Sequence, residues 1–154
     1  MQIEENNVKS ENDLKKEYLR GYRTHVRRIS RIESELAELR AMRSSMSMNN
    51  DGMPHGSGQS DLSSYAAELD RLERKLKDER YNRIMEYKDI AGRIKRIKSE
   101  NEKDVLFYRY IKGMDWWEIA DKMKFSERQI YRFHGKALAH LKLPEKVEDV
   151  SECQ

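Results

Sequence analysis

Apolar residues in the first third of the chain return alternately every four and every three positions, and this spacing is the strongest constraint on the fold. Between residues 13 and 43 the seven positions are Tyr18, Tyr22, His25, Ile29, Ile32, Leu36 and Leu39. That spacing gathers them on one narrow stripe of an α-helix, as in the seam of a coiled coil. A lone helix cannot leave such a stripe exposed, so the sequence predicts a long helix that pairs with another.

A second long helix is predicted over residues 62–98, with Asp61 as its N-cap. Its apolar positions are Leu62, Tyr65, Leu69, Leu72, Leu76, Ile84, Tyr87, Ala91 and Ile94. The step from Leu76 to Tyr87 spans eleven residues, so we expect the supercoil to relax there.

The segment between these helices, residues 44–61, is rich in Ser, Asn, Gly and Met and is the predicted linker. Two helices of matched length suggest an antiparallel hairpin, although pairing between two chains fits the pattern equally well. Tyr22 and His25 could fix the register, and we assign His25 a structural role rather than a ligand role. Residues 1–12 and the acidic tail 144–154 are expected to be flexible.

Composition excludes several classes of protein. Charged residues make up 38% of the chain and hydrophobic residues 37%, which argues against a large globular core. The single cysteine, Cys153, cannot form an internal disulfide or a cysteine zinc site. No apolar run approaches the ~18 residues of a membrane span, and the first ten residues do not resemble a signal peptide. We therefore expect a cytoplasmic protein with no membrane partner.

Residues 99–143 follow a different pattern, which predicts three shorter helices over 101–112, 116–123 and 127–142. Gly113 would end the first. Capping boxes, Asp115 with Glu118 and Ser126 with Gln129, would start the second and third. So short a connection between the last two forces a steep crossing, the geometry of a helix-turn-helix. The predicted fold class is all-α, a long antiparallel hairpin followed by a helix-turn-helix.

The third of these helices combines positive charge with groups that can read bases. Arg128, Arg132 and Lys136 recur every four residues and share one face. Guanidinium groups bind guanine, Gln binds adenine, and Glu accepts from cytosine. A merely solvated face is the competing interpretation of this charge pattern. The predicted DNA-binding residues are Ser126, Glu127, Arg128, Gln129, Tyr131, Arg132 and Lys136.

The segments 102–110, 117–120 and 126–132, followed by Ala137-Leu138, resemble region 4 of bacterial sigma factors. The resemblance covers about 40 residues and implies DNA contact by residues 126–132. The core positions that it implies are Val105, Leu106, Tyr110, Ile119, Ile130 and Ala137. Lys124 departs from the family, which usually has Gly in the turn, so either Lys124 tolerates a strained backbone or the turn differs slightly.

Nothing before Asn101 resembles the promoter-melting segments of sigma factors. Residues 53–61 are instead similar to small phage and prophage proteins related to the RinA/ArpU-type late-transcription regulators. That resemblance implies activation of late or packaging genes in a bacterial host cell.

Further features allow two interpretations. The basic run between Tyr18 and Ile32 could follow a DNA backbone, as could Lys124, or it could pair with acidic residues of the second long helix. The run comprises Arg20, Arg23, Arg27, Arg28 and Arg31, and the acidic candidates are Asp70, Glu73, Asp78 and Glu79. Trp117 could touch a partner such as RNA polymerase, although packing is the simpler role.

Catalysis and cofactor binding find no support in the sequence. Residues 52–58 lack the Gly-Lys-Ser/Thr ending of a phosphate loop. His55, His134 and His140 lack the clustered partners of a metal site. We expect a non-enzymatic regulator that binds double-stranded DNA, with RNA polymerase and a homodimer through the long helices as further partners. The alternatives are a DNA-packaging recognition protein of small-terminase type and a coiled-coil adaptor that binds no DNA.

Overall fold

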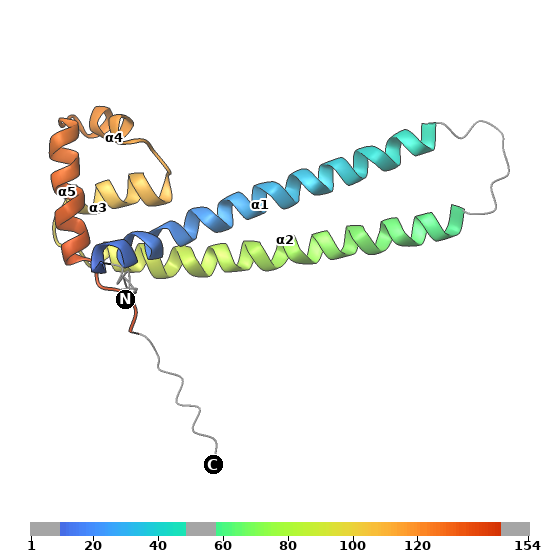
Figure 1. Ribbon diagram of the computed structural model, residues 1–154, viewed down its shortest axis with the longest axis horizontal. Coiled ribbons are helices and arrows are strands. Elements are labelled where there is room, and N and C mark those ends of the chain that lie inside the picture. Colours follow the sequence, from blue (N-terminus) through green and yellow to red (C-terminus); the bar gives the residue numbers. More distant parts are fainter. Residues whose placement is uncertain (1–9, 49–57, 146–154) are drawn as a thin grey trace, which may run out of the picture. The chain divides into compact units, whose positions relative to one another are not determined.

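The computed structural model describes residues 10–48 and 58–145, and every regular element in these ranges is helical. The elements are α1 (Glu11–Met48), α2 (Gly58–Lys95), α3 (Glu100–Leu106), the π-helix η1 (Phe107–Ile111), α4 (Trp116–Met123) and α5 (Glu127–His140) (Figure 1). The predicted all-α class is confirmed. The predictions for residues 1–9, 49–57 and 146–154, including His55 and Cys153, lie outside the described residues.

Both long helices extend further toward the linker than predicted. α1 continues past residue 43 to Met48, and α2 begins at Gly58, so Asp61 lies in its first turn and is not the N-cap. Residues 43–48 include no Gly or Pro to stop a helix. The hydroxyl of Ser44 donates to the carbonyl of Arg40 at 3.2 Å, back along the same helix.

The chain divides into two compact units, residues 22–88 and residues 1–21 together with 89–154. The start of α1 and the end of α2 therefore belong to the same unit as the C-terminal helices. Periodicity alone could not show this, because both long helices continue through the division without a break.

In the unit of residues 22–88, α1 and α2 lie side by side and run in opposite directions (Figure 1). Their buried core comprises Ile29, Ile32, Leu36, Leu72 and Leu76, with Leu39 and Leu69 packed against it. Of the two arrangements that the sequence allowed, the structure has the hairpin within one chain.

The predicted seam of α2 is wrong at Leu62 and Ile84, which are 49% and 53% exposed. The predicted Tyr87 does contact α1, because its ring lies against that of Tyr22 with centroids 5.8 Å apart. The 4-3 spacing continues from Leu76 to Glu79 and Arg83 instead, so there is no eleven-residue step. The apolar pattern did not identify Glu79 and Arg83, because the seam becomes polar at these two positions.

Hydrogen-bonded polar side chains from α1 and α2 occupy this part of the seam. His25 Nδ1 lies 2.8 Å from Glu79 Oε2, and Arg83 Nη2 donates to the Tyr22 hydroxyl at 3.2 Å. Tyr22 itself is buried. Side-chain hydrogen bonds and the contact between the Tyr22 and Tyr87 rings therefore stabilise this part of the seam.

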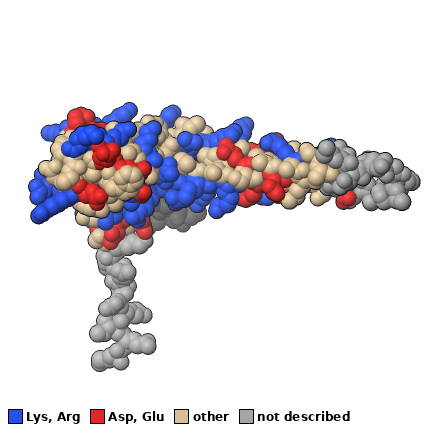
Figure 2. Space-filling model, turned by 90° about the horizontal axis from the view of Figure 1, so that it is seen from above, with Lys and Arg blue, Asp and Glu red and all other residues tan. Residues whose placement is uncertain are grey.

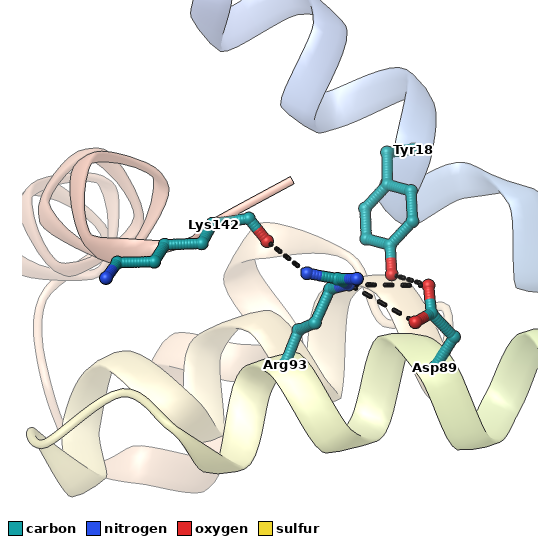
Figure 3. A network of polar contacts seen from close by, with 4 residues as sticks. All are labelled: Tyr18, Asp89, Arg93 and Lys142. Atoms are coloured by element: carbon teal, nitrogen blue, oxygen red, sulfur yellow. Dashed lines mark hydrogen bonds and ion pairs between the residues drawn. The ribbon is translucent and has the colours of Figure 1, made fainter. Parts of the chain in front are cut away.

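In the other unit, polar contacts join α1, α2 and the segment after α5 (Figure 3). The Tyr18 hydroxyl donates to Asp89 Oδ2, and Arg93 Nε donates to Asp89 Oδ1 at 3.2 Å. Arg93 Nη1 also donates to the carbonyl of Lys142 at 3.2 Å. Burial and the hydrogen bond to Asp89 raise the pKa of Tyr18, so the phenol stays protonated and remains a donor.

The C-terminal helices share a second core of Val105, Ile119, Ala120 and Ile130. All six core positions implied by the sigma-factor resemblance are buried, namely Val105, Leu106, Tyr110, Ile119, Ile130 and Ala137. The predicted helix 101–112 is α-helical only to Leu106 and continues as η1. No described helix is both long and apolar enough to cross a bilayer.

Candidate nucleic-acid interface

Side chains and backbone geometry fix where α4 and α5 begin and where α4 ends. The Asp115 N–H donates to Glu118 Oε2 at 2.7 Å, and the Gln129 N–H donates to Ser126 Oγ at 3.3 Å. Both predicted helix starts are therefore confirmed. Gly113, the predicted stop after the preceding helical segment, has a φ of 70°.

The connection between α4 and α5 is a tight turn at Lys124. This residue adopts the left-handed conformation, with φ 61° and ψ 39°, which is the first of the two alternatives that the missing glycine left open. The Phe125 N–H donates to the carbonyl of Ala120 at 3.1 Å and closes the end of α4. A left-handed non-glycine residue costs about 1 kcal/mol, which the packing of the two helices must offset.

α5 has a buried face and an exposed basic face. Ile130, Ala137 and Leu138 are almost fully buried. Arg128 and Arg132 project from the opposite side of the helix and are exposed, as is Lys136 one turn further on. None of these three cations makes a hydrogen bond or ion pair with any residue that the structure describes. Their charges are therefore free to meet an anionic partner.

All seven predicted contact residues lie exposed at the start or along the outside of α5. They are Ser126, Glu127, Arg128, Gln129, Tyr131, Arg132 and Lys136. The structure thus brings together the side chains that the sequence grouped. We call this surface the basic face of α5.

Trp116 packs against two aromatic residues of α5, Tyr131 and His134. Its ring centroid lies 4.9 Å from that of Tyr131, 4.8 Å from that of His134, and 4.5 Å from the guanidinium carbon of Arg109. Trp116 is half-buried, whereas Trp117 is exposed. The sequence did not reveal this cluster, because its members come from separate elements.

His134 lies buried beneath the basic face. Its Nε2 is 2.8 Å from the Tyr110 hydroxyl, and the two rings stack with centroids 5.8 Å apart. Burial, helped by the positive charges of Lys16 and Arg109, lowers the pKa of His134 to about 4. At neutral pH this histidine is therefore an uncharged core residue.

Gly135 is a residue of this surface that the sequence analysis missed. It is exposed, and a Cβ added there would meet nothing within 4 Å. Gly in a helix interior costs about 1 kcal/mol relative to Ala. No neighbouring described residue requires a glycine at this position. A glycine inside a helical run is the sequence signal that could have identified it.

Some arginines of the basic run in α1 pair with other side chains of the protein. Arg28 Nη1 lies 3.8 Å from Glu79 Oε1, and Arg27 donates to Thr24 Oγ1 at 3.3 Å. Figure 2 shows Lys and Arg side chains in several groups with acidic side chains between them. With 31 basic and 28 acidic residues, net charge does not mark a binding surface, and local arrangement must do so.

Comparison with known proteins places the chain in one family. Residues 44–142, well over half of the chain, match the family described as "Protein of unknown function (DUF1492)". No curated protein and no solved structure matches the chain. The matched range includes all of α2 and α3 to α5, and by this match the chain belongs to the DUF1492 family.

Proposed function

We propose that this protein is a sequence-specific, double-stranded-DNA-binding transcription regulator. In this proposal α4 and α5 form a helix-turn-helix, and α5 is the helix that enters the major groove. The observation that carries the proposal is the basic face of α5, whose three cations have no partner among the described residues.

The side chains on this face suit both parts of DNA recognition. Arg128 and Arg132 can each bridge two acceptors of a guanine, and Gln129 can pair with adenine. Lys136, two turns from the start of α5, suits a phosphate contact. The free N–H groups at the N-terminus of α5 also favour a phosphate.

The exposed Gly135 supports close approach of the duplex. It lies on the same side of α5 as Arg128 and Arg132, three and seven residues from them. Because Gly135 has no side chain and lies on the exposed basic face, it allows an external backbone to come near the helix there.

We expect Gly135→Ala to raise the free energy of unfolding by about 0.5–1 kcal/mol, because alanine favours the helix. The larger Gly135→Met should retain folding and weaken DNA binding at least tenfold by holding the duplex away. Urea unfolding and fluorescence anisotropy measure the two effects.

Gly92→Ala is the matched control for this prediction. Gly92 is also helical, with nothing within 4 Å of an added Cβ, so the substitution should stabilise the fold and leave DNA affinity unchanged. Full affinity in Gly135→Met would show that DNA does not approach this part of α5.

The wider role rests on the resemblances of the sequence. We propose a phage or prophage regulator of late genes, without enzymatic activity, that acts near a promoter and contacts RNA polymerase. A homodimer would present two α5 helices to two half-sites, as dimeric helix-turn-helix proteins do.

Selection from a pool of random duplexes tests the proposal most directly. We expect one motif to be enriched by the full chain and to bind about 1,000-fold more tightly than a scrambled duplex. Fluorescence anisotropy at fixed salt gives that ratio. No enrichment over a protein-free control, or equal affinity for both duplexes, would reject sequence-specific recognition.

A further inference from the structure

One side of α2 carries apolar residues that the hairpin does not cover. Tyr81 is 62% exposed, Ile84 53% and Met85 48%. Their spacing places them on one face of the helix. The other face carries Glu79 and Arg83, which bond to residues of α1. We call the three apolar residues the outer patch of α2.

The outer patch is a contiguous apolar surface. Its three side chains leave on the order of 350 Å² per copy open to solvent, comparable to the largest patches on ordinary monomers, which are often functional. Isolated apolar side chains on a surface need no explanation, but neighbouring ones on a single face do.

Charged residues flank the outer patch in a particular order. Asp78 precedes Tyr81 by three residues, and Lys88 follows Met85 by three residues. Both are exposed, and neither makes a hydrogen bond or ion pair with any residue in the described ranges. An acid therefore stands on one side of the patch and a base at the same distance on the other.

This arrangement is complementary to itself. If two α2 helices pack antiparallel about a two-fold axis beside position 83, Asp78 of each copy lies opposite Lys88 of the other. Tyr81 likewise lies opposite Met85, with Ile84 close to the axis. Two-fold pairing brings the same patch of both copies together, so each charge pair forms twice.

We infer that the outer patch of α2 is a homodimer interface, in which a second copy of this chain packs its own α2 antiparallel across the patch. An unrelated partner would not require charges placed symmetrically about the apolar centre. The area is small beside a standard interface of about 1,600 Å², so the dimer forms with a Kd in the micromolar range. This inference concerns residues 22–88 and is independent of DNA binding.

Sedimentation equilibrium of the full chain without DNA tests the inference. The wild type should show a monomer–dimer equilibrium, and Ile84→Asp should weaken it at least tenfold, since it places two charges at the axis. The matched control is Met42→Asp, which changes another exposed apolar residue of the same unit and should leave the equilibrium unchanged. Circular dichroism checks that both variants remain helical.

Charge exchange tests the antiparallel register. Asp78→Lys and Lys88→Asp should each self-associate about tenfold more weakly, because each places like charges opposite one another twice. Mixed together, the two variants should form a heterodimer with restored affinity, and the double exchange in one chain should restore the homodimer.

Several results would overturn the inference. A wild type that stays monomeric at 200 µM, roughly a hundredfold above a low-micromolar Kd, would remove the interface. If Ile84→Asp dimerises as tightly as the wild type, the interface lies elsewhere. A mixture of the two charge variants that stays monomeric would exclude antiparallel pairing in this register.

Discussion

Replacing Arg128 and Arg132 together with alanine is expected to weaken specific DNA binding by about 2–6 kcal/mol, roughly 30-fold or more. Each guanidinium that bridges a guanine contributes about 1–3 kcal/mol of discrimination. The fold should be unaffected, because both side chains are exposed and make no hydrogen bond or ion pair with any described residue. Anisotropy titrations on the selected duplex measure the loss.

The salt dependence separates base contacts from phosphate contacts. If the two arginines contact bases only, the slope of log affinity against log salt should stay the same, while each phosphate contact removed flattens it by about 0.9. Lys136→Ala is expected to flatten the slope and to weaken matched and scrambled duplexes equally.

A variant that removes the same charge elsewhere is the control. Arg71 and Arg74 are exposed on α2 and pair with Glu68 and Asp70 of the same helix. Their joint replacement by alanine should leave specific affinity nearly unchanged. Equal losses in the two double variants would mean that total charge governs binding, which would reject the assignment of α5.

Acidification is expected to destabilise the unit that contains α5. The folded pKa of His134 is about 4, below its ordinary value of 6.5, so the unfolded chain takes up a proton first as the pH falls. Stability is therefore highest above pH 6.5 and decreases down to about pH 4. Between pH 7.5 and pH 5 the loss should be about 2 kcal/mol. Urea unfolding followed by tryptophan fluorescence reports it, because Trp116 lies against His134.

His134→Gln is the control for this prediction. Glutamine keeps a hydrogen-bonding partner near the Tyr110 hydroxyl but does not titrate, so the difference between pH 7.5 and pH 5 should shrink by most of that amount. His140, whose Nδ1 lies 2.7 Å from Glu102 Oε2, remains in both proteins and cancels in the comparison. An unchanged pH dependence in the variant would show that His134 is not the responsible group.

Helices whose ends carry local signals were predicted well from the sequence. Asp115 with Glu118 and Ser126 with Gln129 place the starts of α4 and α5, because a cap acts through residues three positions apart. The left-handed Lys124 was one of two alternatives raised by comparison with the usual glycine of the sigma-factor turn. The exposure of the predicted contact residues followed from helical periodicity alone.

Contacts between residues that are far apart in the sequence could not be predicted from local patterns. The polar part of the α2 seam forms because Tyr22 and His25 provide partners for Arg83 and Glu79. The apolar pattern therefore indicated Ile84, which is 53% exposed. Likewise, the contact of Arg93 with the carbonyl of Lys142 joins residues 49 positions apart, and no local pattern reveals it.

The polar pairs in the seam also limit how the two long helices can slide. A shift of one heptad, ~10.5 Å along the axis, would keep most apolar residues facing each other. It would also separate Glu79, whose side chain is only 15% exposed, from His25, and an unpaired charge with so little solvent access is destabilising. These polar pairs therefore favour one alignment of the two helices. Lengthening the connection between the helices should leave that alignment intact.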